Sequence, residues 1–409
     1  MAKNRILTGR RAFLLSLGAA VGAGGFAIAS RYRQVNNHAQ PIGYEHAEFA
    51  VSGEAPLRER AAKKGLLYGA ATQYESLFQN SKFAEHFAQE CAILVPAREL
   101  KWDALRPSPD RFNFTKADRM AKFALAHDML LRGHTLVWHK ALPRWFEDVV
   151  NSQNAEKILI DHIKTVAGHY AGKMHSWDVV NEAIQPSDGR ADGLRKTPWL
   201  QFLGPDYIDI AFRAAAEADP EALLVYNDHK LEYAKPNNQA RRTKVLRLLE
   251  RLKSSGTPIH ALGLQSHLGV SLNDFNPKKL RNFLKDVASL GLKILVTEMD
   301  VTEKQPRDVA ARDRLIAGIY EDYLSVVLDE PAVSAVITWG LSDRYTWLSR
   351  VAPRKDGTPV RPLPLDAKME RKLAWNAIAR AFDRAPTREV EHEGDRSPKS
   401  KQSSEYVYR

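Results

Sequence analysis

The sequence alternates short apolar runs with longer amphipathic segments, and this alternation restricts the possible folds more than any other feature. Eight apolar runs have the length and composition of buried strands, at residues 66–72, 92–97, 130–138, 176–182, 222–227, 261–267, 293–298 and 335–340. Amphipathic segments with a helical period lie between several of them, at residues 115–127, 155–171, 206–218, 238–254, 277–290 and 308–328. Strands that alternate with helices favour a parallel sheet, and eight repeats predict an α/β fold, the closed (β/α)8 TIM barrel.

A doubly wound open sheet is the structural alternative to a barrel. That fold usually carries a glycine-rich phosphate-binding turn directly after its first strand. The sequence GAATQ at residues 69–73 does not match the pattern of such a turn. The barrel is therefore the favoured prediction.

The first 29 residues have the pattern of an export signal. Residues 1–11 are basic and contain no acid, residues 12–29 are uncharged and mildly apolar, and AIA at 27–29 is a small-residue cleavage pattern. Arg10 and Arg11 begin a sequence similar to the twin-arginine export motif. An uncleaved membrane anchor is the alternative, although these 18 residues barely cross ~30 Å of hydrocarbon at ~1.5 Å each.

Composition divides the rest of the chain and excludes one class of partner. We expect a linker at 30–60, the catalytic barrel at 61–385 and a disordered polar tail at 386–409. The net charge of +11 includes four leader charges, and no basic run lies beyond the leader, so nucleic-acid binding is not expected. The single cysteine, Cys91, permits no internal disulfide. Eight Trp and thirteen Tyr are rings that pack in a core or bind a flat apolar surface such as a sugar face.

Polar and aromatic side chains follow six of the predicted strands. They occur in GHTLVWH at 133–139, Trp177, Asn181 and Glu182, YNDH at 226–229, QSH at 265–267, Glu298 and Asp300, and Trp339 with Trp347 nearby. Each alone has a structural explanation, since a lone Trp is usually core and a lone His usually a satisfied structural group. In a parallel barrel these strand ends meet at one face, where the chemistry of such folds lies. The pattern therefore predicts one functional cleft.

Glu182 and Glu298 are the candidate catalytic residues. Two carboxyl groups among aromatic rings suit glycosidic cleavage, in which one protonates the departing oxygen and the other attacks or stabilises the sugar cation. His267 is expected to support Glu298, with Asp300 holding His267 in turn, and Asn181 is expected to bind a substrate hydroxyl. No His-x-x-x-His pair lies on a predicted helix, and this chemistry needs neither a metal nor a cofactor.

Six ordered motifs resemble those of glycoside hydrolase family 10, the retaining endo-β-1,4-xylanases. They are ELKW at 99–102, HTLVWH at 134–139, WDVVNEA at 177–183, LGLQSH at 262–267, VTEMD at 296–300 and TWGLSD at 338–343. The resemblance covers about residues 60–383 and implies a (β/α)8 barrel with Glu182 as acid/base and Glu298 as nucleophile. It also implies sugar-binding roles for Lys101, His134, Trp138, Asn181, Gln265, Trp339 and Trp347.

Two positions depart from the family pattern. Ala97 and Arg98 stand where the family usually has Glu-Asn, and Lys140 and Ala141 stand where it usually has Ser-Gln. The resemblance implies that both positions serve the sugar one step further from the cleaved bond on the non-reducing side, so selective hydrogen bonds are lost there. The two cations suit an anionic or substituted sugar, or they are solvated surface charges, and both interpretations stay open.

These observations predict an exported, monomeric, retaining endo-β-1,4-glycosidase of polysaccharide degradation, with xylan as its first substrate. A bacterial exopolysaccharide or another substituted β-glycan is the alternative substrate, and a non-catalytic carbohydrate-binding protein is the alternative class. We expect the twin-arginine export machinery as a partner and a periplasmic or secreted location, or a membrane-anchored one if the leader is not cleaved.

Overall fold

The computed structural model describes residue 44 and residues 47–269, 274–304 and 308–388. Their strands form one parallel sheet that closes on itself through the pairing of β6 with β8. The strands are β1 (Leu67–Thr72), β2 (Ile93–Pro96), β3 (Leu130–Val137), β4 (Met174–Asn181), β5 (Leu223–Asp228), β6 (Ala261–Leu264), β7 (His267–Gly269), β8 (Lys293–Thr302) and β9 (Val333–Thr338). Every one of the eight predicted runs contains a strand, so the predicted (β/α)8 barrel is confirmed.

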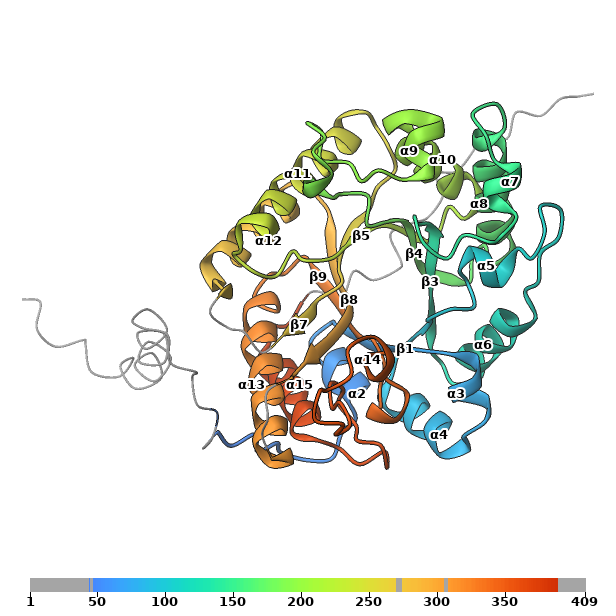
Figure 1. The fold of residues 1–409 in the computed structure, drawn as a ribbon. Helices are drawn as coiled ribbons and strands as arrows, with labels where there is room; N and C mark the ends of the chain where they lie inside the picture. Colours follow the sequence, from blue (N-terminus) through green and yellow to red (C-terminus); the bar gives the residue numbers. More distant parts are fainter. Residues whose placement is uncertain (1–43, 45–46, 270–273, 305–307, 389–409) are drawn as a thin grey trace, which may run out of the picture. The chain divides into compact units, whose positions relative to one another are not determined.

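Helices surround this ring of strands, as Figure 1 shows in a view along the barrel. The longer ones are α4 (Ser81–Glu90), α6 (Thr115–Ala126), α8 (Ala155–His169), α10 (Tyr207–Ala218), α11 (Pro236–Ser254), α12 (Pro277–Ser289), α13 (Val309–Val327) and α15 (Leu373–Arg384). The shorter ones are α2 (Leu57–Ala62), α3 (Tyr74–Phe78), α5 (Trp102–Leu105), α7 (Phe146–Val149), α9 (Pro198–Leu203) and α14 (Leu348–Val351). None of the helices in the described part of the chain is long and apolar enough to cross a membrane.

The two faces of the strands bury different side chains, and this explains their unbroken apolar runs. A small cluster of mostly small and β-branched residues fills the inside of the barrel: Ala71, Ile93, Val95, Val225, Ala261, Leu295, Ala335 and Ile337. A much larger cluster lies between the strands and the helices and includes Leu94, Leu131, Leu224, Leu262 and Val336. Strands that are covered on both faces are apolar at successive positions, as in other parallel barrels.

The sixth predicted run differs from the expectation of one continuous strand. It is divided into β6 and β7, because Ser266 between them has a φ of +60°. The Ser266 amide points away from the ladder and donates a hydrogen bond of 3.0 Å to the buried Glu232 carboxylate. β7 then pairs with the far end of β8, in a register that places His267 beside Asp300.

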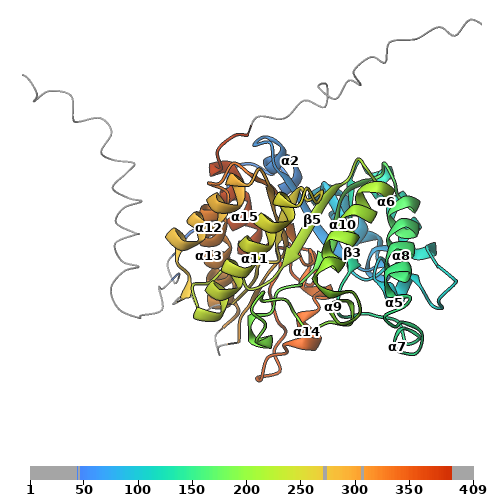
Figure 2. The same cartoon turned by 90° about the horizontal axis from the view of Figure 1, so that it is seen from above.

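The two ends of the barrel carry different elements. Figure 2 shows α5, α7, α9 and α14, which all follow strands, along one edge, and α2, which precedes β1, along the other. Loops that follow strands therefore gather at the carboxyl ends of the strands, where a (β/α)8 barrel forms its active site.

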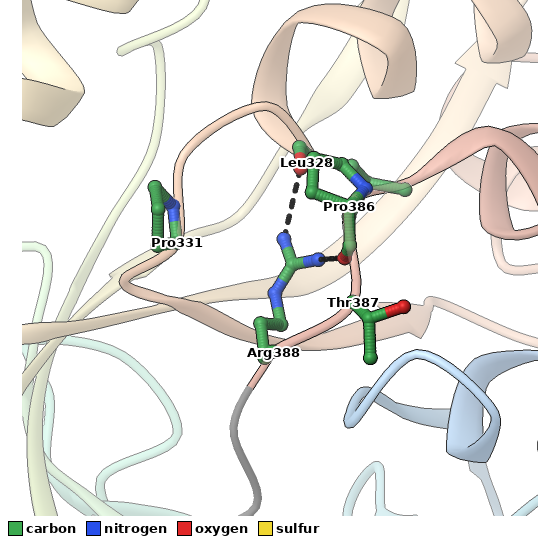
Figure 3. Close-up of a pocket in the computed structure, with 5 residues that line it drawn as sticks. All are labelled: Leu328, Pro331, Pro386, Thr387 and Arg388. Carbon is green, nitrogen blue, oxygen red and sulfur yellow. Dashed lines mark hydrogen bonds between the residues drawn. The ribbon is translucent and has the colours of Figure 1, made fainter.

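A pocket of about 340 Å³ lies away from this end and is lined by Leu328, Pro331, Pro386, Thr387 and Arg388 (Figure 3). The Arg388 guanidinium donates to the carbonyl oxygens of Pro386 at 2.7 Å and Leu328 at 2.9 Å. The same side chain reaches the Val333 carbonyl at the start of β9, and the Arg388 amide donates to Lys64 just before β1. These contacts connect the segment after α15 to the amino-terminal ends of β1 and β9, and they make Arg388 a structural residue.

The predicted leader (1–29), residues 30–43 of the predicted linker and the tail from 389 onward lie outside the described residues.

Candidate active site

The polar residues predicted from the sequence converge at the carboxyl ends of the strands. Asn181 ends β4 with Glu182 directly after it, Gln265 and His267 lie at the break between β6 and β7, and Glu298 lies within β8. All five are less than one tenth exposed except His267, which is partly exposed. Because adjacent parallel strands end at the same face, hydrogen bonds connect these side chains across the barrel.

Glu298 is a buried carboxylate held by two donors. Asn227 Nδ2 donates to its Oε1 at 2.8 Å, and His267 Nε2 lies 3.3 Å from its Oε2. Burial raises the pKa of Glu298, but the His267 hydrogen bond and nearby positive charge, including that of Lys101, outweigh burial and lower the pKa to about 2. Glu298 is therefore ionised throughout the range in which most enzymes work, as a nucleophilic carboxylate requires.

His267 owes its charge to a second carboxylate. Its Nδ1 lies 2.9 Å from Asp300 Oδ1, and the Trp347 indole donates to Asp300 Oδ2 at 2.8 Å. Burial lowers the pKa of His267, but the charges and hydrogen bonds of Asp300 and Glu298 raise it well above the ordinary value. His267 is thus an imidazolium that donates to both carboxylates, and Trp347 fixes the Asp300 carboxylate from the other side.

Asn227, near the end of β5, holds side chains of two other strands, Asn181 of β4 and Glu298 of β8. Its Oδ1 accepts a hydrogen bond of 2.7 Å from Thr297, so its Nδ2 must face the cleft. That Nδ2 donates to Asn181 Oδ1 at 3.0 Å as well as to Glu298. The side chain fits because residue 263 on the neighbouring strand is glycine: a Cβ there would lie 2.2 Å from Asn227 Oδ1.

Glu182 begins the loop after β4 in a strained conformation. Its φ is +58°, a left-handed geometry that costs a non-glycine residue about 1–3 kcal/mol. The Glu182 amide donates to the Asn227 carbonyl at 2.8 Å, and Arg195 Nε donates to the Glu182 carbonyl at 2.7 Å. Gln265 Nε2 donates to its Oε1 at 3.1 Å, and the Arg195 guanidinium lies 3.6 Å from its Oε2. These contacts turn the Glu182 side chain toward Gln265 and the cleft.

The protonation of Glu182 depends on two neighbouring histidines. Burial raises the pKa of Glu182, whereas the His229 charge, the Gln265 hydrogen bond and the His139 charge lower it. When both histidines are charged, the net result is a lowered pKa of Glu182. Burial itself lowers the pKa of His229 to about 3 and that of His139 to about 4. Both rings are thus neutral near pH 7, so their lowering of the Glu182 pKa is lost there, while burial and the charge on Glu298 still act to raise that pKa. This is the direction that a general acid requires.

A continuous chain of hydrogen bonds links the two carboxyl groups. It runs from Glu182 through Gln265, Asn181 and Asn227 to Glu298, with donor–acceptor distances of 3.1, 3.2, 3.0 and 2.8 Å. Asn181 accepts through its Oδ1 in both of its bonds, which leaves its Nδ2 available to donate to a substrate hydroxyl. One carboxylate that stays ionised and a second carboxyl group in a different environment thus share a single cleft.

Aromatic and basic side chains border the same cleft. Lys101 Nζ lies 5.0 Å from the ring centre of Trp138 and 5.9 Å from that of Trp339. The His134 ring stands edge-on to Trp339 with 5.2 Å between centres, and its Nδ1 lies 2.9 Å from the buried Asp178. Trp138, Trp339 and Lys101 are all half-buried, so each presents part of its surface to a bound molecule.

The sequence did not assign roles to Asn227, Arg195, His229 or Gly263, which hold the two carboxyl groups in place. A signal for Asn227 existed, because it ends the fifth predicted strand at the position that Asn181 occupies in the fourth. Arg195 and His229 lie in loops whose course no periodicity predicts. Within the described ranges, no group of three or more His, Cys, Asp or Glu residues is arranged to hold a metal ion.

Comparison with known proteins adds an independent finding. The sequence model of glycosyl hydrolase family 10 matches residues 56–381. The chain is 36% identical over 300 residues to endo-1,4-beta-xylanase B of Thermotoga neapolitana, covering 73% of this chain and 84% of that protein. It is 35% identical to beta-1,4-xylanase of Dictyoglomus thermophilum, covering 74% and 84%.

A solved structure agrees with these sequence matches. Xylanase 10B from Thermotoga petrophila RKU-1, in complex with xylobiose, superimposes with a TM-score of 0.74 at 34% identity. The match covers 82% of this chain and 99% of that structure.

The first prediction concerns Gly263→Ala. The new methyl group would collide with Asn227, so Asn227 must move away from Glu298 and Asn181. We expect kcat/KM for an aryl β-glycoside to fall about 10- to 100-fold, as small misplacements of catalytic groups do. Gly269→Ala is the matched control, because a Cβ there meets nothing within 4 Å. A folded Gly263→Ala enzyme, judged by its melting temperature, with undiminished kcat/KM would remove Asn227 from the account.

The second prediction concerns pH. His267 lowers the pKa of Glu298, so replacing it by an uncharged donor, in His267→Asn, must let that pKa rise. The acidic limb of the kcat/KM profile, where Glu298 takes up a proton, is expected to move at least one pH unit upward. His127→Asn, on the exposed end of α6, is the control. An acidic limb that stays in place in His267→Asn would contradict the assignment of this limb to Glu298.

Proposed function

Because the chain belongs to glycosyl hydrolase family 10, we propose that it is an exported endo-1,4-β-xylanase that cleaves internal xylosidic bonds with retention of anomeric configuration. The supporting observation is the pair of unlike carboxyl groups, Glu182 and Glu298, joined through three amide side chains in one cleft. The xylanases of Thermotoga and Dictyoglomus, at 36% and 35% identity, support xylan as the substrate.

The proposed reaction is a double displacement. In the first step Glu298 attacks the anomeric carbon while Glu182 gives its proton to the departing sugar oxygen, which leaves a glycosyl ester on Glu298. In the second step the ionised Glu182 takes a proton from water, the resulting hydroxide attacks the anomeric carbon, and Glu298 is released as a carboxylate. Two inversions at one carbon give net retention, and Glu182 ends with the proton that it had at the start.

Each neighbour has a part in this sequence. His267 and Asn227 stabilise Glu298 as a free carboxylate, so it can both attack and leave. Asn181 Nδ2 is available to bind the hydroxyl next to the reacting carbon. Trp339 and Trp138 offer ring surface to the sugar faces. The negative charge on Glu298 acts to raise the pKa of Glu182. It disappears when the ester forms, so the pKa of Glu182 falls, and Glu182 is ionised and able to accept a proton from water in the second step.

The third prediction tests the acid role. In Glu182→Gln, kcat/KM reports the first step, and it should fall about 10²- to 10⁴-fold for xylo-oligosaccharides, whose leaving group needs a proton. For an aryl xylobioside with an acidic phenol the loss should be small, because that phenol leaves unprotonated. Asp192→Asn, in the same loop but exposed and paired with Arg190, is the control. Equal losses on both substrates would contradict the acid role, and a wild-type enzyme inactive on xylan would contradict the proposed substrate.

The fourth prediction concerns export, which rests on the sequence of the leader alone. Changing both Arg10 and Arg11 to lysine keeps the charge but removes the arginine pair. The uncleaved chain should then accumulate in the cytoplasm, as seen by cell fractionation and immunoblotting, while Arg5→Lys is exported normally. Export of the double variant at the normal rate would exclude the twin-arginine route.

A further inference from the structure

Two lysines lie over the Trp138 ring and Arg98 lies near one of them, and Arg98 and Lys140 stand at the positions where the sequence departs from its family. Lys101 Nζ lies 5.0 Å and Lys140 Nζ 5.7 Å from the centre of the Trp138 ring. Arg98 is close enough to Lys101 for its charge to lower the pKa of Lys101, although burial contributes more to that lowering. We call Arg98, Lys101, Trp138 and Lys140 the Trp138 shelf.

The shelf has more positive charge than the protein neutralises. Arg98 forms an ion pair of 2.8 Å with Asp103, and just over half of the Arg98 side chain is exposed. Lys101 and Lys140 form no ion pair with any residue in the described part of the chain. Asp103 is thus the one carboxylate in ion-pair contact with these three cations in the described part of the chain, and Lys101 is half-buried, where an ammonium group without a close ion pair is unfavourable.

The shelf is continuous with the catalytic cleft. The negative charge of Glu298 acts on Lys101, so the ammonium group lies on the Glu298 side. Lys101 also lies 5.9 Å from the Trp339 ring, which borders the cleft. Lys140, over the same Trp138 ring, contributes with its charge to the lowered pKa of His139. A sugar chain bound across Glu298 and along Trp138 would therefore lie close to Lys101 and Lys140.

A plain solvated surface would not require this arrangement. Exposed lysines normally keep their ammonium groups in bulk water and away from one another, since like charges repel. Here two ammonium groups lie over one indole ring and a guanidinium lies beside them. A cation–π contact stabilises each of them by about 0.5–1 kcal/mol at an exposed site, but it leaves the net charge of the group unchanged.

We propose that the Trp138 shelf binds a carboxylate carried by the substrate, so that the preferred glycan is an acidic one. The inference rests on the proposed function, because it assumes that a β-1,4-glycan occupies the cleft. The Trp138 ring would pack against a sugar face, and Lys140 and Arg98 would donate charge-assisted hydrogen bonds to the carboxylate. That carboxylate belongs either to a uronosyl unit of the backbone or to a uronosyl side group, since both present the same anion.

The fifth prediction compares matched acidic and neutral substrates. The first pair is a β-1,4-xylo-oligosaccharide with one glucuronosyl side group and the same compound after reduction of its carboxyl group to an alcohol. The second pair has the uronosyl unit in the backbone, again with its carboxyl-reduced partner. The ratio of kcat/KM for the acidic member to that for the neutral member of each pair isolates the effect of the carboxylate charge. We expect one pair to give a ratio of at least fivefold, the size expected for two partly exposed ion pairs.

Substitutions and changes of salt concentration then test whether the preference for the acidic substrate comes from the Trp138 shelf. Changing both Arg98 and Lys140 to alanine should bring the ratio close to one, and Lys140→Glu should reverse it. Lys122→Ala, an exposed lysine on α6, should leave it unchanged. In the wild-type enzyme, raising the salt concentration from 50 to 500 mM should lower the ratio, because salt screens exposed charges. The ratio cancels any loss of activity that both substrates share.

Wild-type ratios at or below one for both pairs would overturn the proposal while xylan hydrolysis still supports the proposed function. A high ratio that survives in the double variant would overturn the assignment to Arg98 and Lys140. If neither the neutral nor the acidic member of either pair is cleaved, the proposed function itself is wrong.

Discussion

The buried negative charge of Glu298 is the constraint on which the rest of the site depends. An ionised carboxylate at about 5% exposure is unstable without partners. His267 supplies the opposite charge and Asn227 a neutral donor, but His267 keeps its proton only because Asp300 lies on its other side. The site therefore contains a relay of alternating charge, from Asp300 through His267 to Glu298, with Lys101 beyond it.

The barrel makes this arrangement possible through strand register. His267 is paired with Asp300 between β7 and β8, Asn181 with Asn227 between β4 and β5, and Asn227 with Gly263 between β5 and β6. Side chains at paired positions on parallel strands point to the same face. Consequently the donors that stabilise Glu298 come from neighbouring strands, and hydrogen bonds within the protein hold them in place. Preorganised dipoles of this kind stabilise charge without reorganisation during the reaction.

The sequence predicted the barrel, and it singled out the two carboxyl groups that lie in one cleft of the structure, for physical reasons. Strands covered on both faces leave unbroken apolar runs, and a polar residue that ends such a run stands out, as Glu182 and Glu298 do. Asn227 was passed over because a lone amide at a strand end is commonly structural, and its role follows only from Thr297 and Gly263 on the adjoining strands. Arg195 was beyond prediction, because its contact with Glu182 depends on the path of a loop. The break at Ser266 was missed because it depends on a contact with the distant Glu232.

Trapping the glycosyl-enzyme intermediate tests the central claim most directly. A 2-deoxy-2-fluoro aryl xylobioside has a good leaving group for the first step and a fluorine that slows the second, so the ester should accumulate. Mass spectrometry of the proteolysed enzyme is predicted to find the added glycosyl mass on Glu298. A label on Glu182, or turnover of the reagent with no label at all, would contradict the assignment of Glu298 as the nucleophile.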